Sequence, residues 1–276
     1  MSLKLEIILS FFLIFSFGII HGANDITLIH SSSDSPRAPK ITKTLLNYLM
    51  AVGLGIVLFF IVPSLALVLF VLVSSYHFGE QHFNYVETKN SKGVILFMFS
   101  YGLTILSLIF YNHTVEVASI IENITQFSID AKHFKILLLF SLSLLLTSGI
   151  YVFKQDREFQ KSALQEIINL LVLALLFKVS PLLFGFSIYF VFWHSIPSMY
   201  NQIEFLHGEI TLKTIGLYLK QAALFWIISL LGIGILGFLL MDTYLFEALL
   251  FSFIAAITFP HVWVMIQLFK TKKANP

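Results

Sequence analysis

Four histidines in the sequence occupy similar places, each near one end of a long apolar segment. They are His21, His77, His194 and His261. An imidazole that leaves water for apolar surroundings tends to stay neutral, because burial disfavours its charged form. Neutral imidazole is a good ligand for iron, zinc, copper and nickel. We therefore predict that these four side chains converge on one metal ion, as its ligands and as the catalytic residues. The alternative for any one of them alone is an interfacial or helix-capping histidine.

Residues beside the histidines supply other groups that a metal site needs. Asp25 follows His21 by four residues and Glu80 follows His77 by three, so each carboxylate would share a helical face with its histidine. There it would accept the second ring N–H of that histidine. Aromatic side chains near the histidines are candidates for the wall of an apolar substrate tunnel: Tyr76, Tyr189, Trp193 and Tyr200.

Small residues and prolines also accompany the histidines. Gly22 and Gly79 each adjoin, or nearly adjoin, a histidine and indicate places where two helices approach closely. Pro197 and Pro260 are predicted to interrupt helices next to His194 and His261. Broken helices at membrane depth are tolerated mainly where they line a cavity or are buried in protein.

The composition says what kind of element must position these side chains. Of the 276 residues, 58% are hydrophobic and only 12% are charged, and the mean hydropathy is +0.89. A soluble domain carries about 25% charged residues, so we predict an all-α, polytopic integral membrane helical bundle. We expect a single integral membrane domain over residues 1–276. The absence of cysteine excludes disulfides, thiolate ligands and iron–sulfur clusters. The net charge of +2 does not indicate nucleic-acid binding, since the basic residues lie in short loops.

Apolar runs long enough to cross a bilayer give about nine (eight to nine) transmembrane helices. The nine segments are Glu6–His21, Thr44–Val62, Ser64–Gly79, Gly93–Tyr111, Phe134–Phe153, Ser162–Lys178, Leu182–Tyr200, Thr214–Leu240 and Tyr244–Phe269. A break is predicted near Pro63, because one helix across the second and third segments would be about 54 Å long. The four histidines fall on segments one, three, seven and nine, which run in the same direction. They lie about 20–25 Å from the start of each segment and so share one depth.

The basic residues predict the orientation of the chain. Nine crossings leave 4 of the 17 lysines and arginines on one face and 13 on the other. Because cytoplasmic loops carry the excess of positive charge, we expect the N-terminus outside and the C-terminus in the cytoplasm. The histidines then lie near the cytoplasmic end of the hydrocarbon region.

The motifs around the histidines resemble a known family. They are His21-Gly22-Ala23-x-Asp25, Ser75-Tyr76-His77-Phe78-Gly79, Trp193-His194-Ser195 and Pro260-His261. The order of these motifs, the length of the chain and its number of spans resemble those of the Brp/Blh family of bacterial and archaeal β-carotene 15,15'-dioxygenases. The resemblance covers essentially the whole chain. The resemblance implies a non-haem Fe(II) enzyme that cleaves the central double bond of β-carotene with O₂ to give two molecules of all-trans-retinal.

The resemblance carries one departure. Some members of the family have a second histidine one helical turn after the position of His194, and this chain has Ser198 there. The fourth ligand is then His261, as we expect, or the site is a variant near Ser198. The resemblance further implies a multi-pass protein of the cell (inner) membrane, surrounded by lipid, whose retinal is supplied to a rhodopsin-type protein.

Two other classes of function remain open from the sequence. A haem- or metal-binding membrane protein would also use intramembrane histidines, as axial pairs on facing helices for haem. A carotenoid or ion transporter without cleavage activity would use them as a relay, but it would need more polar groups at the midplane than the sequence supplies. The sequence also leaves open monooxygenase against dioxygenase chemistry, the range of carotenoids and the oligomeric state.

Overall fold

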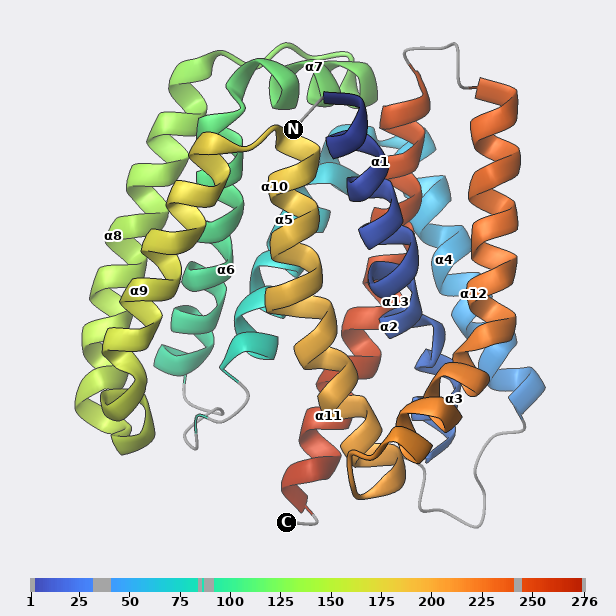
Figure 1. Ribbon diagram of the computed structural model, residues 1–276. Coiled ribbons are helices and arrows are strands. Elements are labelled where there is room, and N and C mark those ends of the chain that lie inside the picture. The colour runs from blue at the N-terminus through green and yellow to red at the C-terminus, as the bar shows by residue number, and fades with distance from the viewer. Residues whose placement is uncertain (1–2, 32–40, 84–85, 87–91, 241–244, 275–276) are drawn as a thin grey trace. The chain divides into compact units, whose positions relative to one another are not determined.

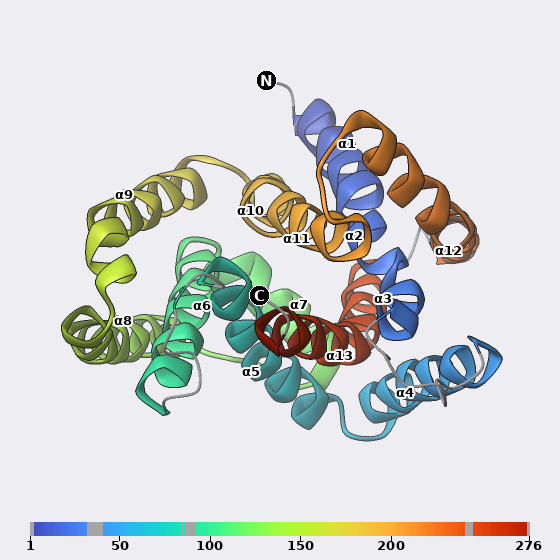
Figure 2. The same cartoon turned by 90° about the horizontal axis from the view of Figure 1, so that it is seen from below.

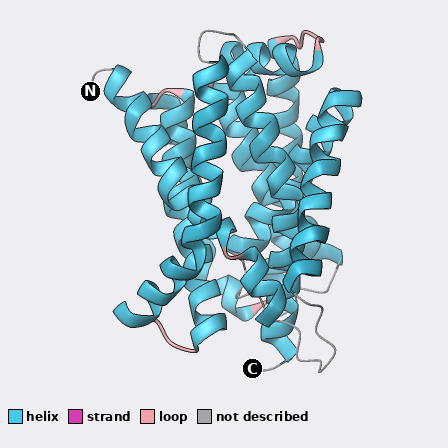
Figure 3. Ribbon diagram, turned by 90° about the vertical axis from the view of Figure 1, so that its right-hand side faces the viewer, coloured by secondary structure: helices cyan, strands magenta, loops and turns pink. Residues whose placement is uncertain are grey.

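The computed structural model describes residues 3–31, 41–83, 86, 92–240 and 245–274. Within these ranges the regular structure is helical and contains no strand (Figure 1 and Figure 3). In chain order the elements are α1 (Leu3–Leu13), the π-helical turn η1 (Ile14–Gly18), α2 (Ile19–Ala23), α3 (Asp25–Ser31), α4 (Ile41–Ile61), α5 (Pro63–His82), α6 (Lys92–Asn112), α7 (Thr114–Thr125), α8 (Ala131–Gln155), α9 (Arg157–Val179), α10 (Leu182–Tyr189), the π-helical turn η2 (Phe190–Ser195), α11 (Ile196–His207), α12 (Leu212–Leu240) and α13 (Leu245–Ala274).

Nine helical stretches of the described chain are long and apolar enough to cross a membrane. They are Lys4–Ser31, Ile41–Ile61, Pro63–His82, Lys92–Asn112, Ala131–Gln155, Arg157–Val179, Leu182–His207, Leu212–Ile235 and Ser252–Thr271. Each overlaps one predicted segment, so the prediction of an all-α fold with about nine spans is confirmed. The first and seventh stretches continue well beyond the predicted ends, past His21 and Tyr200. The predicted start of the last segment, Tyr244, lies outside the described residues.

The chain divides into two compact units, which are described separately. One unit comprises Met1–Ser10 and Val68–Tyr189, and the other comprises Phe11–Leu67 and Phe190–Pro276. The prediction of a single integral domain over residues 1–276 stays a prediction.

In the unit of Met1–Ser10 and Val68–Tyr189, helices α6, α8 and α9 pack side by side (Figure 1). Helices α5 and α6 approach each other at two glycines. A Cβ atom on Gly79 would overlap the carbonyl group of Met98, and one on Gly102 would overlap that of Ser75. Glycine is therefore required for this backbone-to-backbone contact. The close approach predicted at Gly79 is confirmed.

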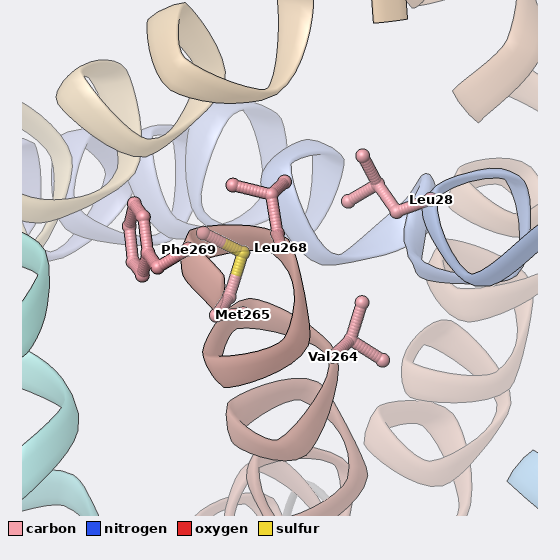
Figure 4. Packing of buried hydrophobic residues seen from close by; sticks show 5 residues of the cluster. All are labelled: Leu28, Val264, Met265, Leu268 and Phe269. Atoms are coloured by element: carbon pink, nitrogen blue, oxygen red, sulfur yellow. The ribbon is translucent and has the colours of Figure 1, made fainter. Parts of the chain in front are cut away.

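In the unit of Phe11–Leu67 and Phe190–Pro276, helices α3, α4 and α13 lie side by side (Figure 2). The crossing of α4 and α13 uses small residues, since a Cβ on Gly55 would lie only 3.0 Å from Cα of Ala256. Figure 4 shows the buried apolar cluster that joins α3 to α13, made of Leu28, Val264, Met265, Leu268 and Phe269. This cluster begins one helical turn beyond His261 and fixes α13 against the segment that follows His21.

The three prolines singled out in the sequence behave differently. Helix α4 ends at Ile61 and α5 begins at Pro63, so the predicted break is confirmed. Pro197 lies in the first turn of α11, directly after η2. The predicted interruption at Pro260 is wrong, because α13 continues through it. Proline removes one backbone donor, but in lipid each further unpaired backbone group would be costly, which favours keeping the rest of the helix intact.

Candidate metal centre

Three of the four predicted histidines meet in one place. His21, His194 and His261 each offer a ring nitrogen, and these nitrogens all lie within 4.8 Å of one another. The ring centroid of His21 lies 5.2 Å from that of His194 and 4.7 Å from that of His261. All three side chains are buried. Their segments, α2, η2 with α11, and α13, run in the same direction in Figure 1, as the shared depth in the sequence predicts.

Two of these histidines are positioned by π-helical turns. Turn η1 ends at Gly18, three residues before His21, and η2 contains His194. A π turn widens the helix by one residue and so changes the direction of the side chains that follow; such turns are frequent at functional sites. Within η2 the hydroxyl of Ser195 donates to the carbonyl of Phe190 at 2.8 Å. Pro197 then has no N–H to continue a regular ladder of hydrogen bonds.

The phenylalanine at the start of η2, Phe190, packs against two of the imidazoles. The ring of Phe190 stacks on that of His194, with centroids 5.3 Å apart and planes 17° from parallel. It meets the ring of His21 edge-on, with a centroid distance of 5.6 Å. It also lies beside Gly18, where a Cβ atom would be 2.8 Å from Cε1 of Phe190. The glycine in η1 thus makes room for the ring of Phe190, which packs against both histidines.

Hydrogen bonds behind the rings fix which nitrogen of two histidines faces the centre. Nδ1 of His21 donates to the carbonyl of Gly18, within its own helix. Nδ1 of His261 lies 2.9 and 3.0 Å from the two carboxylate oxygens of Asp25. In both rings the proton is then on Nδ1, and Nε2 carries the lone pair. The hydroxyl of Tyr48, on α4, donates to Asp25 at 2.7 Å.

The predicted partner of Asp25 was wrong in one respect. The spacing in the sequence paired Asp25 with His21, whereas the carboxylate contacts His261, far away in the chain. Asn24 interrupts the helix between α2 and α3 and turns Asp25 off the face that carries His21. The intrahelical carbonyl of Gly18 takes the place predicted for the carboxylate. The close approach predicted at Gly22 is also not required, since the nearest atom to an added Cβ is Nδ1 of His261 at 3.8 Å, an ordinary contact.

This donor set fits a metal ion that prefers imidazole. Bonds from a metal to imidazole nitrogen are about 2.1 Å long, so two such nitrogens on one ion lie at most about 4.2 Å apart. The three histidine nitrogens are up to 4.8 Å apart, so only small shifts of the side chains would bring them within bonding distance of one ion. Nε2 of His21 is buried and has no hydrogen-bond partner within the described part of the chain. A buried nitrogen left without a partner is expected where a ligand completes it.

Comparison with known proteins agrees with this geometry. The family described as "Beta-carotene 15,15'-dioxygenase" matches residues 12–269. The chain belongs to this family. It is also 28% identical over 261 residues to a protein named "Beta-carotene 15,15'-dioxygenase" from an uncultured marine bacterium (66A03), covering 92% of this chain and 90% of that protein. No solved structure matches the chain significantly. The resemblance inferred from the motifs is confirmed, and family membership makes the chain an oxidoreductase of the carotene-cleaving kind.

The fourth predicted ligand of this dioxygenase-family chain, His77, lies in the other unit. It is buried on α5, as is Glu80. Oε1 of Glu80 accepts a hydrogen bond from the hydroxyl of Tyr76 at 2.9 Å. The convergence of His77 with the other three histidines and the pairing of Glu80 with His77 stay predictions.

Ser198 takes part in a buried network of α11, α12 and α13. Its Oγ accepts from Nε2 of Gln202 at 3.1 Å and lies 4.0 Å from Sδ of Met265. The hydroxyl of Tyr218 donates to Oε1 of Gln202 at 2.7 Å. Ser198 is therefore hydrogen-bonded within this network. The third ring nitrogen of the histidine group, beside those of His21 and His194, comes from His261. This arrangement favours His261 over a variant site near Ser198.

The four aromatic residues predicted to line a tunnel have different surroundings. Tyr189 is buried, between the rings of Phe78 and Phe177 at centroid distances of 5.4 and 6.1 Å. Tyr76 and Trp193 are partly buried, whereas Tyr200 is half exposed. A tunnel wall made by these residues stays a prediction.

Three contributors to the centre were missed in the sequence. Tyr48, Phe190 and Gly18 carry no motif that distinguishes them from the many other aromatic and small residues of a membrane helix. The only signal in the sequence was position: Gly18 is three residues before His21 and Phe190 is four before His194. Tyr48 has no such signal, because its contact depends on how α4 packs.

Proposed function

We propose that the chain is a membrane-embedded non-haem iron oxygenase that cleaves β-carotene at its central 15,15' double bond with O₂, yielding two molecules of all-trans-retinal. The observation that carries the proposal is the buried group of three histidine nitrogens within 4.8 Å, in a chain of the β-carotene 15,15'-dioxygenase family. An all-nitrogen donor set suits iron, and it differs from the two-histidine, one-carboxylate set of many Fe(II) oxygenases.

In this proposal His21, His194 and His261 hold Fe(II), and His77 supplies the fourth ligand. Iron would supply the activation of O₂. The protein's own part is to keep Nε2 of His21 and of His261 available, through the hydrogen bonds of their Nδ1 atoms to Gly18 and Asp25. Asp25 also orients its histidine, since carboxylates behind ligand imidazoles fix ring orientation and raise basicity.

The substrate explains why such a centre lies among apolar helices. β-Carotene is a hydrocarbon that dissolves in the bilayer and offers no polar group for recognition. The position of cleavage must then be set by apolar contacts that hold the chain of double bonds in one register. Tyr76, Tyr189 and Trp193 remain our candidates for such contacts, with Tyr200 the weakest because of its exposure. Buried apolar surroundings also exclude water from the reacting atoms.

We further propose a multi-pass location in the cell membrane, with the N-terminus outside and the C-terminus in the cytoplasm. The nine membrane-length helices and the 4-to-13 distribution of basic residues support this orientation. The retinal formed in the bilayer would be supplied to a rhodopsin-type protein. Reporter fusions to each terminus test the orientation: activity of a cytoplasm-specific reporter at the N-terminus would contradict it.

Expression in cells that accumulate β-carotene tests the central proposal. The cells should lose colour and produce retinal, and the purified protein should contain iron. His21→Ala should abolish both the bleaching and the iron, whereas His133→Ala, at an exposed position on α8, should change neither. Unchanged pigment with folded, iron-loaded protein would refute carotene cleavage. A Soret band would instead indicate a haem protein, and carotenoid transfer without retinal would indicate a transporter.

A further inference from the structure

Helix α5 carries a buried polar face on the same side as His77. Ser74, His77 and Gln81 are spaced by three and four residues, which places them on neighbouring turns of one helical face. Their exposed fractions are 1%, 1% and 2%. The contact of α5 with α6 uses another face, which holds Ser75 and Gly79. The polar face is therefore separate from the packing against α6.

Two side chains of this face have unused hydrogen-bonding capacity. In the described part of the chain, neither the nitrogen nor the oxygen of the Gln81 carboxamide has a partner, and neither does the hydroxyl of Ser74. The adjacent Ser75 contrasts with them, because its hydroxyl donates to the carbonyl of Val71 at 2.6 Å. Burying an amide without a partner is unfavourable. Its retention here indicates a partner that is not part of the protein.

The position of the amide relates this partner to the reaction. Side chains on an α-helix lean toward its N-terminus, so Gln81 covers the turn that carries His77. If His77 is a metal ligand, a molecule bound to Gln81 lies beside the reacting bond. The hydrocarbon substrate has no atom that accepts a hydrogen bond. Each product has one, because addition of the two atoms of O₂ across the cleaved double bond leaves one carbonyl oxygen on each aldehyde.

We propose that Gln81, assisted by Ser74, forms a hydrogen-bonding site for the aldehyde oxygen of the retinal product. The Nε2–H of Gln81 donates to that oxygen, and the Ser74 hydroxyl, about two turns earlier on the same face, is a second donor. This inference rests on the proposed function and extends it from the metal ligands to product binding. It predicts that the enzyme distinguishes an aldehyde from a hydrocarbon of the same shape, which apolar contacts alone would not do.

The test uses the iron-loaded enzyme and the variant Gln81→Met, which keeps the length of the side chain and removes its hydrogen bonds. Retinal and its hydrocarbon analogue without the aldehyde oxygen are each added as inhibitors of β-carotene cleavage. Loss of one hydrogen bond should weaken inhibition by retinal about five- to tenfold and leave inhibition by the analogue unchanged.

Ser74→Ala should give a smaller change in the same direction. Ser75→Ala, whose hydroxyl bonds within α5, is the matched control and should give none. Equal inhibition by retinal in Gln81→Met and in the unaltered enzyme would overturn the proposal, and would mean that only water occupies the amide.

Two further measurements distinguish a product-binding amide from one that only stabilises the fold. Gln81→Met should not lower the melting temperature, because the amide has no partner in the described protein to lose; a clear decrease would reveal an internal structural role and overturn the proposal. Binding of retinal and of the analogue, measured by quenching of tryptophan fluorescence, needs no turnover. Preferential binding of the aldehyde without carotene cleavage would support the site and refute the proposed reaction. Cleavage without such preference would refute the site alone.

Discussion

Both carboxylate oxygens of Asp25 lie within hydrogen-bonding distance of Nδ1 of His261, at 2.9 and 3.0 Å. The two residues come from α3 and α13, at opposite ends of the sequence, and both are buried. A negative carboxylate behind the ring holds it in one tautomer and one orientation. The contact therefore joins the first and last membrane segments at the proposed metal centre.

Asp25→Asn should weaken metal binding by about 10- to 100-fold, the usual effect of losing a partner of a ligand histidine. The amide keeps the size of the side chain but removes its charge and one acceptor. Competition with a chelator on the purified protein measures the metal affinity directly. Asp130→Asn, at the exposed N-cap of α8, is the control and should bind metal like the unaltered protein. Equal affinity in Asp25→Asn would show that the carboxylate does not act on the metal through His261.

Tyr48→Phe should weaken metal binding less than Asp25→Asn does, by about three- to tenfold. It removes the 2.7 Å hydrogen bond that orients the Asp25 carboxylate but leaves the charge in place. Combining both substitutions should add little to Asp25→Asn alone, because Tyr48 acts through that carboxylate. The same chelator competition measures all three variants, with Tyr111→Phe on an exposed part of α6 as control. Fully additive effects in the double variant would argue against this order of action.

Gly18→Ala should distort the centre through Phe190. The new Cβ would lie 2.8 Å from Cε1 of Phe190, and that ring is stacked on His194 and cannot move without disturbing it. We expect a loss of metal affinity of at least about tenfold, since overpacking a close contact displaces its neighbours. The absorption spectrum of the cobalt-substituted protein reports the change in ligand geometry.

Two comparisons make this prediction specific. Gly53→Ala on α4 has no atom within 4 Å of the added Cβ and should leave the spectrum unchanged. Adding Phe190→Leu to Gly18→Ala should restore part of the affinity, because the smaller side chain gives back the space. Failure of this rescue, with both single variants folded, would mean that Gly18 affects the metal by another route.

Much of the fold could be predicted from the sequence because lipid imposes a simple rule. Every span must be a continuous apolar helix, so the nine segments are visible as runs of residues. The count of residues along each run then gave the depth of His21, His194 and His261, and these three do meet. Two predictions failed on the course of a helix: α13 continues through Pro260, where an interruption was expected, and the first span is interrupted where none was. The interruption between α2 and α3 takes Asp25 off the helical face that carries His21. No pattern in the local sequence predicts this interruption.

The rest depends on packing between distant segments. Tyr48 contacts Asp25 only because α3, α4 and α13 lie side by side, which no spacing within one helix encodes. Phe190 is one of 30 phenylalanines, and only the π turns η1 and η2 distinguish it. A single-residue widening of a helix leaves almost no trace in hydropathy. Counting along the spans thus predicted that His21, His194 and His261 meet, whereas spacing within one helix predicted the hydrogen-bond partner of Asp25 wrongly.

A second buried polar cluster, in the unit of Met1–Ser10 and Val68–Tyr189, supports a prediction about stability. Oε2 of Glu166 on α9 accepts from the ring of His82, from the hydroxyl of Tyr101 at 3.2 Å and from the amide of Asn169 at 3.3 Å. The ring of His82 also stacks on that of Tyr101, with centroids 4.9 Å apart. One carboxylate oxygen thus joins α5, α6 and α9.

Glu166→Leu should destabilise the folded protein by about 3 kcal/mol, because it leaves three donors at a largely buried position without their acceptor. The side chains of His82 and Glu166 are only 16% and 11% exposed, so water compensates little. Unfolding in detergent measures the change.

The matched control on the same helix is Glu158→Leu. Glu158 pairs with Lys161, but the side chains of Glu158 and Lys161 are 49% and 71% exposed. Ion pairs that are this exposed contribute little to stability. Similar stability of the two variants would show that the cluster is no stronger than a surface ion pair.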